Sequence, residues 1–117
     1  MQKLTIMLMR LFELWELDQA TKLNFLGLSI KSRSSLTHYM KGKSLPKSRD
    51  MLDRAGYLLS IHKALRLLYP KNVVIRHTWI KRRNQAFNNF SPLELIQEEG
   101  MLGLAKVARH LDFIRGH

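Results

Sequence analysis

Helical periodicity is the feature that most limits what this chain can fold into. Apolar residues recur three and four positions apart through most of the sequence, as Leu4, Leu8, Leu11 and Trp15 show near the start. This spacing puts the apolar side chains on one face of an α-helix. The only candidate strand is the short run at residues 73–75. We therefore predict an all-α protein.

Caps and helix breakers predict where the helices begin and end. Asp18 can cap a helix that Gly27 closes, and Ser29 or Ser32 can cap the next helix. Pro70 must end a long central helix of residues 48–69, because proline cannot continue a helix. The helix that begins after residue 29 is expected to end at residue 42. The other helices are expected at residues 4–17, 72–82, 92–99 and 102–114. We expect the following residues to face inward from the third and fourth helices: Leu36, Tyr39, Met40, Leu52, Ala55, Leu58, Leu59, Leu65 and Leu68.

Residues 83–96 form the most informative segment. Ser91 and Glu94 have the spacing of a capping box, in which each side chain bonds the backbone N–H of the other residue. Pro92 occupies the first helical position, where its missing N–H costs nothing. Asn88 and Asn89 tolerate positive φ angles. The segment therefore predicts a tight loop followed by a firmly capped helix.

The charge distribution favours a polyanionic partner. The formal net charge is +11. No acid occurs between Gln19 and Arg49, a stretch that holds Lys22, Lys31, Arg33, Lys41, Lys43, Lys47 and Arg49. An unbroken basic field is typical of nucleic-acid binding. The alternative is a solvated basic surface without a partner.

Other compositional features limit the location of the chain. Cysteine is absent, which suits a reducing cytoplasm. No apolar run approaches membrane-spanning length. The apolar residues 1–15 contain Arg10 and precede no small-residue cleavage site, so we expect a helix instead of a signal peptide.

The second and third helices have the proportions of a helix-turn-helix, in which the start of the second helix enters the DNA major groove. Arg33 could bond a guanine edge, whereas the lysines would mostly neutralise phosphates. The predicted DNA-binding residues are Lys31, Ser32, Arg33, Ser34, Ser35, Thr37, His38, Lys41, Lys43 and Lys47. A helix pair of this kind can also be simple packing, with its serines only solvated.

The sequence gives little indication that the protein is an enzyme. The histidines show no metal-binding spacing, and no cofactor is expected. Ser91 is explained by its capping role, and His62 by a satisfied core or boundary position on the long helix. Glu98 and Glu99 are adjacent, so they point to different helix faces and form a poor acid–base pair.

The ordered set of motifs resembles the Xre/MbcA/ParS antitoxin family. Residues 84–96 resemble its Asn-x-x-Phe-Gly-Gly-x-Ser-Pro-Leu-Glu-Leu hallmark, with Asn88 and Asn89 in place of the glycines and Arg83 where proline is usual. The other similar segments are residues 25–29, 39–42, 58–65 and 69–70, together with Arg54, Trp79, Val107, Leu111 and Asp112.

The resemblance implies an antitoxin whose partner is a RES-domain toxin that targets NAD. It implies a helix-turn-helix region at residues 1–47 that binds operator DNA, a toxin-binding domain at residues 48–117, and a homodimer or a larger complex with the toxin. The toxin's active site would be blocked sterically. The residues expected to bind the toxin are Trp79, Arg82, Arg83, Asn84, Phe87, Phe90, Arg109, Asp112, Phe113, Arg115 and His117. The alternative function is a helix-turn-helix regulator without a toxin.

The final residues could form an inhibitory tip. The carboxylate of His117 would occupy an anion subsite, and Arg115 would pair with an acidic residue of the toxin. The competing interpretation is a frayed terminus that contacts nothing.

Overall fold

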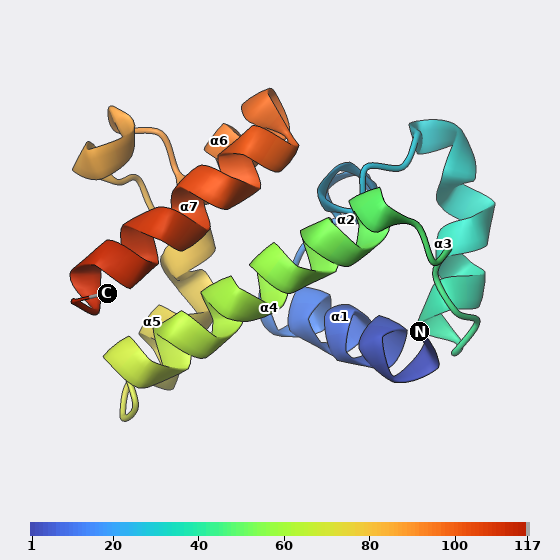
Figure 1. Cartoon of the computed structure of the whole chain (residues 1–117), viewed down its shortest axis with the longest axis horizontal. Helices are drawn as coiled ribbons and strands as arrows, with labels where there is room; N and C mark the ends of the chain where they lie inside the picture. Colours follow the sequence, from blue (N-terminus) through green and yellow to red (C-terminus); the bar gives the residue numbers. More distant parts are fainter. Residues whose placement is uncertain (117) are drawn as a thin grey trace. The chain divides into compact units, whose positions relative to one another are not determined.

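The structure, a computed structural model, describes residues 1–116, and no strand occurs among them (Figure 1). The all-α prediction is therefore confirmed. In chain order the elements are α1 (Gln2–Leu14), α2 (Gln19–Phe25), the 3₁₀ turn η1 (Ile30–Ser32), α3 (Arg33–Met40), α4 (Arg49–Leu68), α5 (Val73–Thr78), the 3₁₀ turns η2 (Trp79–Lys81) and η3 (Gln85–Phe87), α6 (Pro92–Glu99) and α7 (Met101–Ile114).

Side-chain caps fix several of these boundaries. The Asp18 carboxylate accepts a hydrogen bond from the Thr21 N–H at 2.8 Å. Ser29 caps η1 by accepting from the Lys31 N–H at 3.1 Å, whereas Ser32 makes no side-chain cap. Of the two serines predicted as caps, Ser29 therefore has that role.

The chain forms two compact units, which divide between Gly56 and Tyr57 within α4. The first unit has a core of apolar side chains from α1, α2, α3 and the start of α4. In it the rings of Phe12 and Phe25 meet edge to face, with centroids 6.2 Å apart. The buried Thr5 hydroxyl accepts a hydrogen bond from the Leu45 N–H at 2.9 Å, which holds the segment after α3 against α1.

The second unit contains the rest of α4, α5, α6 and α7. Figure 1 shows α6 and α7 as neighbouring helices, and they share many close contacts. Gly103 makes this close crossing possible, because a Cβ at this position would lie 2.7 Å from the Leu95 carbonyl oxygen. Buried residues of α4, η2, α6 and α7 form its core: Leu58, Ile61, Ala64, Leu65, Trp79, Ile80, Ile96, Leu104, Val107 and Leu111.

Two predicted inward positions are wrong. Met40 is 46% exposed and Leu52 is 41% exposed. Each follows a buried neighbour, Tyr39 or Met51, and consecutive residues differ by about 100° around a helix. The buried stripe is narrower than predicted, so the second residue of each pair points to solvent. Leu59 and Leu68 are half-buried, and the other predicted positions are buried.

Candidate functional site

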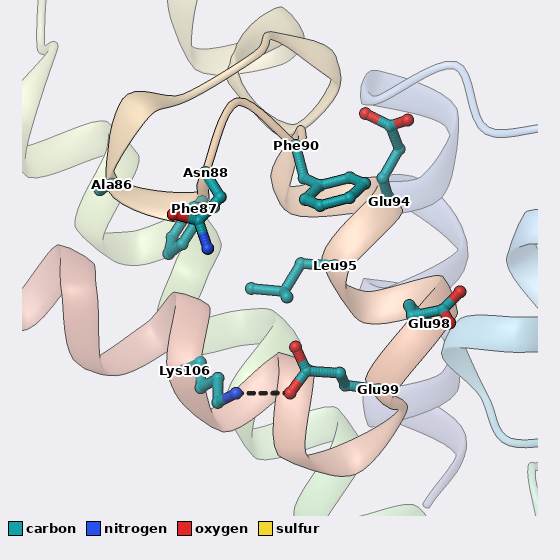
Figure 2. A pocket seen from close by; sticks show the side chains of 9 residues that line it. All are labelled: Ala86, Phe87, Asn88, Phe90, Glu94, Leu95, Glu98, Glu99 and Lys106. Atoms are coloured by element: carbon teal, nitrogen blue, oxygen red, sulfur yellow. Dashed lines mark hydrogen bonds and ion pairs between the residues drawn. The ribbon is translucent and has the colours of Figure 1, made fainter.

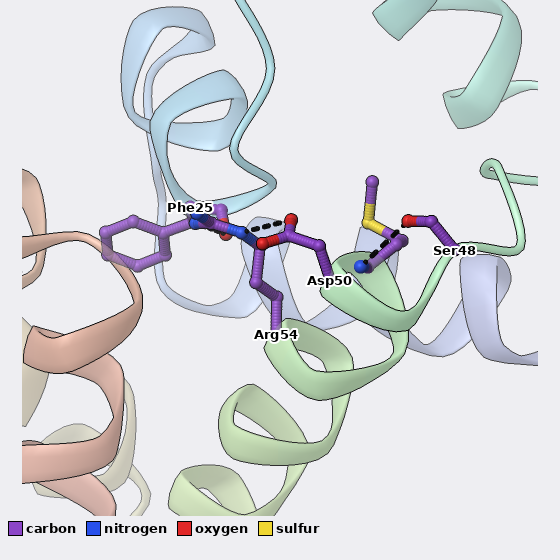
Figure 3. A network of polar contacts seen from close by, with 5 residues as sticks. Phe25, Ser48, Asp50 and Arg54 are labelled. Atoms are coloured by element: carbon purple, nitrogen blue, oxygen red, sulfur yellow. Dashed lines mark hydrogen bonds and ion pairs between the residues drawn. The ribbon is translucent and has the colours of Figure 1, made fainter.

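The turn between α2 and η1 is held by a side chain from α4. Gly27 has a φ angle of +69°, and a Cβ at this residue would lie 2.5 Å from Nε of Arg54. Arg54 donates to the Asp50 carboxylate at 2.8 Å and to the Phe25 carbonyl at 3.4 Å (Figure 3). The clamp fixes the end of α2, and with it the point at which the next helix begins.

The surface after this turn is basic and polar. Most of the predicted DNA-binding residues are exposed on it: Lys31, Arg33, Ser34, Thr37, His38, Lys41, Lys43 and Lys47. Ser32 and Ser35 are half-buried. η1 and α3 thus present positive charge and hydroxyl groups to solvent, which are groups that bond phosphates and base edges.

In the second unit, residues 83–91 form a compact loop, called here the capped loop. Asn88 and Asn89 have φ angles of +54° and +67°, so the predicted left-handed backbone is confirmed. Glu94 N–H donates to the Ser91 hydroxyl at 3.0 Å, and Ser91 N–H donates to the Glu94 carboxylate at 2.9 Å. The predicted capping box is therefore present.

Asn84 and Arg83 organise the same loop. The Asn84 carbonyl accepts from the N–H groups of Phe87 and Asn89, and the Asn84 N–H donates to the Phe90 carbonyl at 3.1 Å. Arg83 donates to the Asn89 carbonyl at 3.2 Å. These two residues, predicted to bind the toxin, thus have internal structural roles.

Hydrogen bonding keeps Glu94 ionised. The Ser91 backbone N–H, and then the Ser91 hydroxyl, lower the pKa of Glu94, and the charge of Arg83 acts in the same direction. Burial acts in the opposite direction, and its effect on the pKa is larger than that of Arg83. The helix start therefore carries a negative charge at neutral pH.

Comparisons with known proteins match the second unit to a known family. Residues 64–116 match the family described as the antitoxin Xre/MbcA/ParS C-terminal toxin-binding domain. The chain belongs to this antitoxin family. A Sinorhizobium fredii protein, called uncharacterized protein y4oB, is 31% identical over 108 residues, which cover 92% of this chain and 80% of the relative. No solved structure matches the chain.

Membership of the antitoxin family gives the chain its broad role, that of an antitoxin in a toxin–antitoxin system with a toxin as partner. The matched region contains the capped loop and the whole of α6 and α7. Within residues 1–116, no helix is long and apolar enough to span a membrane. No cluster of three or more potential metal ligands occurs in that part of the chain.

The aromatic residues of the antitoxin's toxin-binding half differ in accessibility. Trp79 is only 8% exposed and packs in the core, so it offers little surface to a partner. Phe87 is half-buried, and its ring meets the His110 ring edge to face with centroids 5.0 Å apart. Phe90 and Phe113 are 53% and 76% exposed. These two aromatic side chains are the ones most available to a toxin.

The polar residues predicted to bind the toxin are mostly at the surface. Arg82 and Arg109 are exposed, and Arg82 Nε donates to the Thr78 hydroxyl at 3.0 Å. Arg115 lies 3.6 Å from the exposed carboxylate of Asp112, so an acidic toxin residue would compete with this internal pair. His117 lies outside the described residues.

The antitoxin also has a surface groove that the sequence did not predict. It lies beside the capped loop, and its lining includes Leu95, Glu98, Glu99 and Lys106 in addition to residues of the loop. The i, i+4 spacing of Leu95 and Glu99 is the signal that could have placed these two residues on one helix face. The spacing could not show that the capped loop covers one side of this face.

Proposed function

We propose that this antitoxin neutralises a RES-domain toxin that targets NAD, by covering the toxin's active site, and that it represses its own operon by binding DNA. The family match supports a toxin partner. The exposed Phe90 and Phe113 support a protein-binding surface on the second unit, since aromatic residues often supply much of the binding energy at interfaces.

The basic face of η1 and α3 supports the DNA-binding half of the proposal. In a helix-turn-helix the start of the second helix reaches the base edges in the major groove. Arg33 occupies the first position of α3 and is exposed. A homodimer would present two such helices to a palindromic operator, because half-site spacing follows the protein's two-fold symmetry.

Co-expression with the protein encoded beside the antitoxin tests the central claim. The full chain should co-purify with that toxin, and cells that contain both proteins should keep their NAD while cells with the toxin alone lose it. Replacing both Phe90 and Phe113 by alanine should weaken co-purification and protection. A toxin that consumes no NAD, or that ignores the antitoxin, would contradict the proposal.

A matched variant separates loss of contact from loss of folding. Leu67 and Val74 are 54% and 64% exposed in the same unit, and neither lines the groove or belongs to the predicted toxin-binding set. Their double replacement by alanine also removes exposed apolar surface from this unit. It should leave protection unchanged, whereas the Phe90 and Phe113 double variant should not.

A further inference from the structure

The groove beside the capped loop has the shape of a site for one or two side chains. Its volume is about 220 Å³, which is below the range of most small-molecule sites. Figure 2 shows Phe87, Phe90 and Leu95 around the hollow, with Lys106 and Glu99 paired along one side. The remaining lining residues are Ala86, Asn88, Glu94 and Glu98.

The groove is held by rigid elements. Asn84 closes the capped loop through three backbone hydrogen bonds, and the capping box fixes the start of α6. α6 in turn lies close against α7 at Gly103. A preformed hollow of this kind requires little ordering when a partner binds, which favours affinity.

The rim of the groove is acidic in an otherwise basic protein. It carries Glu94, Glu98 and Glu99, three of the nine acids in a chain of net charge +11. Glu99 is neutralised by Lys106 and Glu94 is bonded to the Ser91 N–H. Within residues 1–116, Glu98 has no hydrogen bond or ion pair. Its exposed carboxylate is therefore free to meet a cation.

We propose that this groove takes one segment of the toxin, which inserts an aromatic or aliphatic side chain between Phe87, Phe90 and Leu95 and sets an adjacent Arg or Lys against Glu98. This inference rests on the proposed function and specifies the partner's chemistry. Nucleic acid is a poor occupant, because its phosphates would face the carboxylates of the rim. An apolar side chain next to a cation would contact the apolar residues of the groove and also pair with the acidic rim.

The test uses the full antitoxin and its purified toxin in a calorimetric titration. Glu98→Arg should weaken binding about tenfold, because it replaces an attraction by a repulsion at the rim. Leu95→Ala removes part of the apolar lining of the groove and should weaken binding by roughly fivefold or more. Circular dichroism must show that both variants keep the wild-type helicity.

Two control variants match these changes outside the groove. Asp53→Arg makes the same charge change at an exposed acid of α4, and Leu67→Ala removes the same side chain from an exposed site in the second unit. Both controls should bind the toxin as the wild type does. If Asp53→Arg weakens binding as much as Glu98→Arg, only net charge matters and the docking proposal is wrong.

A charge exchange identifies the segment. Peptides that tile the toxin sequence, screened with the intact antitoxin, should bind where an apolar residue adjoins Arg or Lys. Changing that Arg or Lys to Glu in the whole toxin should restore binding to the Glu98→Arg antitoxin. Failure of every such exchange would overturn the proposed pairing.

The outcomes separate the two proposals. If the wild-type chain binds the toxin and both groove variants bind equally well, the docking proposal fails and the antitoxin function stands. If the wild-type chain does not bind, both fail. If Glu98→Arg changes only the sedimentation of the free antitoxin, the groove is an interface between copies of this chain and the toxin-docking proposal is overturned.

Discussion

The guanidinium of Arg54 occupies the space that a side chain on Gly27 would need. A Cβ on Gly27 would lie 2.5 Å from Arg54 Nε. From this position Arg54 bonds the Phe25 carbonyl and the Asp50 carboxylate. A single side chain therefore links α4 to the turn that precedes the predicted DNA-binding helix.

Gly27→Ala should destabilise the first unit. The substitution puts a Cβ at a φ angle of +69° and displaces Arg54 from the Phe25 carbonyl. The left-handed conformation alone costs about 1–2 kcal/mol for a residue with a Cβ. Urea unfolding would measure the loss.

A double-mutant cycle separates backbone strain from the clash. Arg54→Ala frees the space, so Gly27→Ala should cost less in the Arg54→Ala background than in the wild type. Equal costs in both backgrounds would show that Arg54 yields without penalty and that only the backbone conformation matters.

The capped loop should not tolerate β-branched residues. Changing both Asn88 and Asn89 to Val puts such residues at φ angles of +54° and +67°, at a cost of about 1–2 kcal/mol each. Thermal unfolding would show the loss, and toxin binding should fall with it. Changing both residues to Gly, which is the control, should leave binding intact.

Removing the cap of α6 should also loosen this unit. Ser91→Ala deletes the hydroxyl that accepts the Glu94 N–H, at a cost of about 1 kcal/mol. DNA binding should not change, because the basic face belongs to the other unit. Thermal unfolding and a gel shift on the same preparation would check both halves of this prediction.

The antitoxin should lose stability in mild acid. Burial, followed by the charges of Arg66, His77 and Arg76, lowers the pKa of His62 from its ordinary 6.5. The unfolded chain therefore binds a proton at a higher pH than the folded chain, so stability falls as the pH drops below about 6.5. Unfolding at pH 7.5 and pH 5.5 would measure this, and His62→Gln should reduce the difference. The opposite slope would contradict the lowered pKa.

DNA binding should depend steeply on salt. If four or five of the exposed bases contact phosphates, the logarithm of affinity should fall with the logarithm of salt at a slope of about −4. Gel shifts on the promoter at several salt concentrations would give the slope. Arg33→Ala should relax base preference, whereas Lys43→Ala should weaken all sequences alike. A flat salt response would refute phosphate binding.

Deleting residues 113–117 tests the inhibitory tip. Phe113 and Ile114 are 76% and 47% exposed, so the fold should survive their removal. The truncated antitoxin, which has also lost Phe113, should bind the toxin more weakly but still through Phe90 and the groove, and it should no longer prevent NAD loss. Full protection by the truncated chain would place the blockade elsewhere on the second unit.

The sequence was most informative where structure is decided locally. The capping box at Ser91, the left-handed Asn88 and Asn89, and the end of α4 before Pro70 depend on hydrogen bonds and sterics within a few residues. These contacts do not depend on the tertiary structure, so the local sequence is enough to predict them.

Surface and burial were less predictable. Met40 and Leu52 carry apolar side chains on helices, as core residues do, yet both are exposed. The neighbouring helix decides which face of a helix is buried. Where the apolar face is wider than the area that the neighbour covers, the residues at its edge stay exposed to solvent.

The sequence by itself determined the all-α class, the caps at Asp18 and Ser91, the basic charge and the antitoxin family. Only the tertiary structure decided that Arg54 lies against Gly27, that Trp79 is withdrawn into the core, and that Leu95 and Glu98 line a groove with Phe87. Each of these relationships joins separate elements. Helical periodicity fixes the direction of a side chain along its own helix, but the packing of the elements decides what that side chain meets.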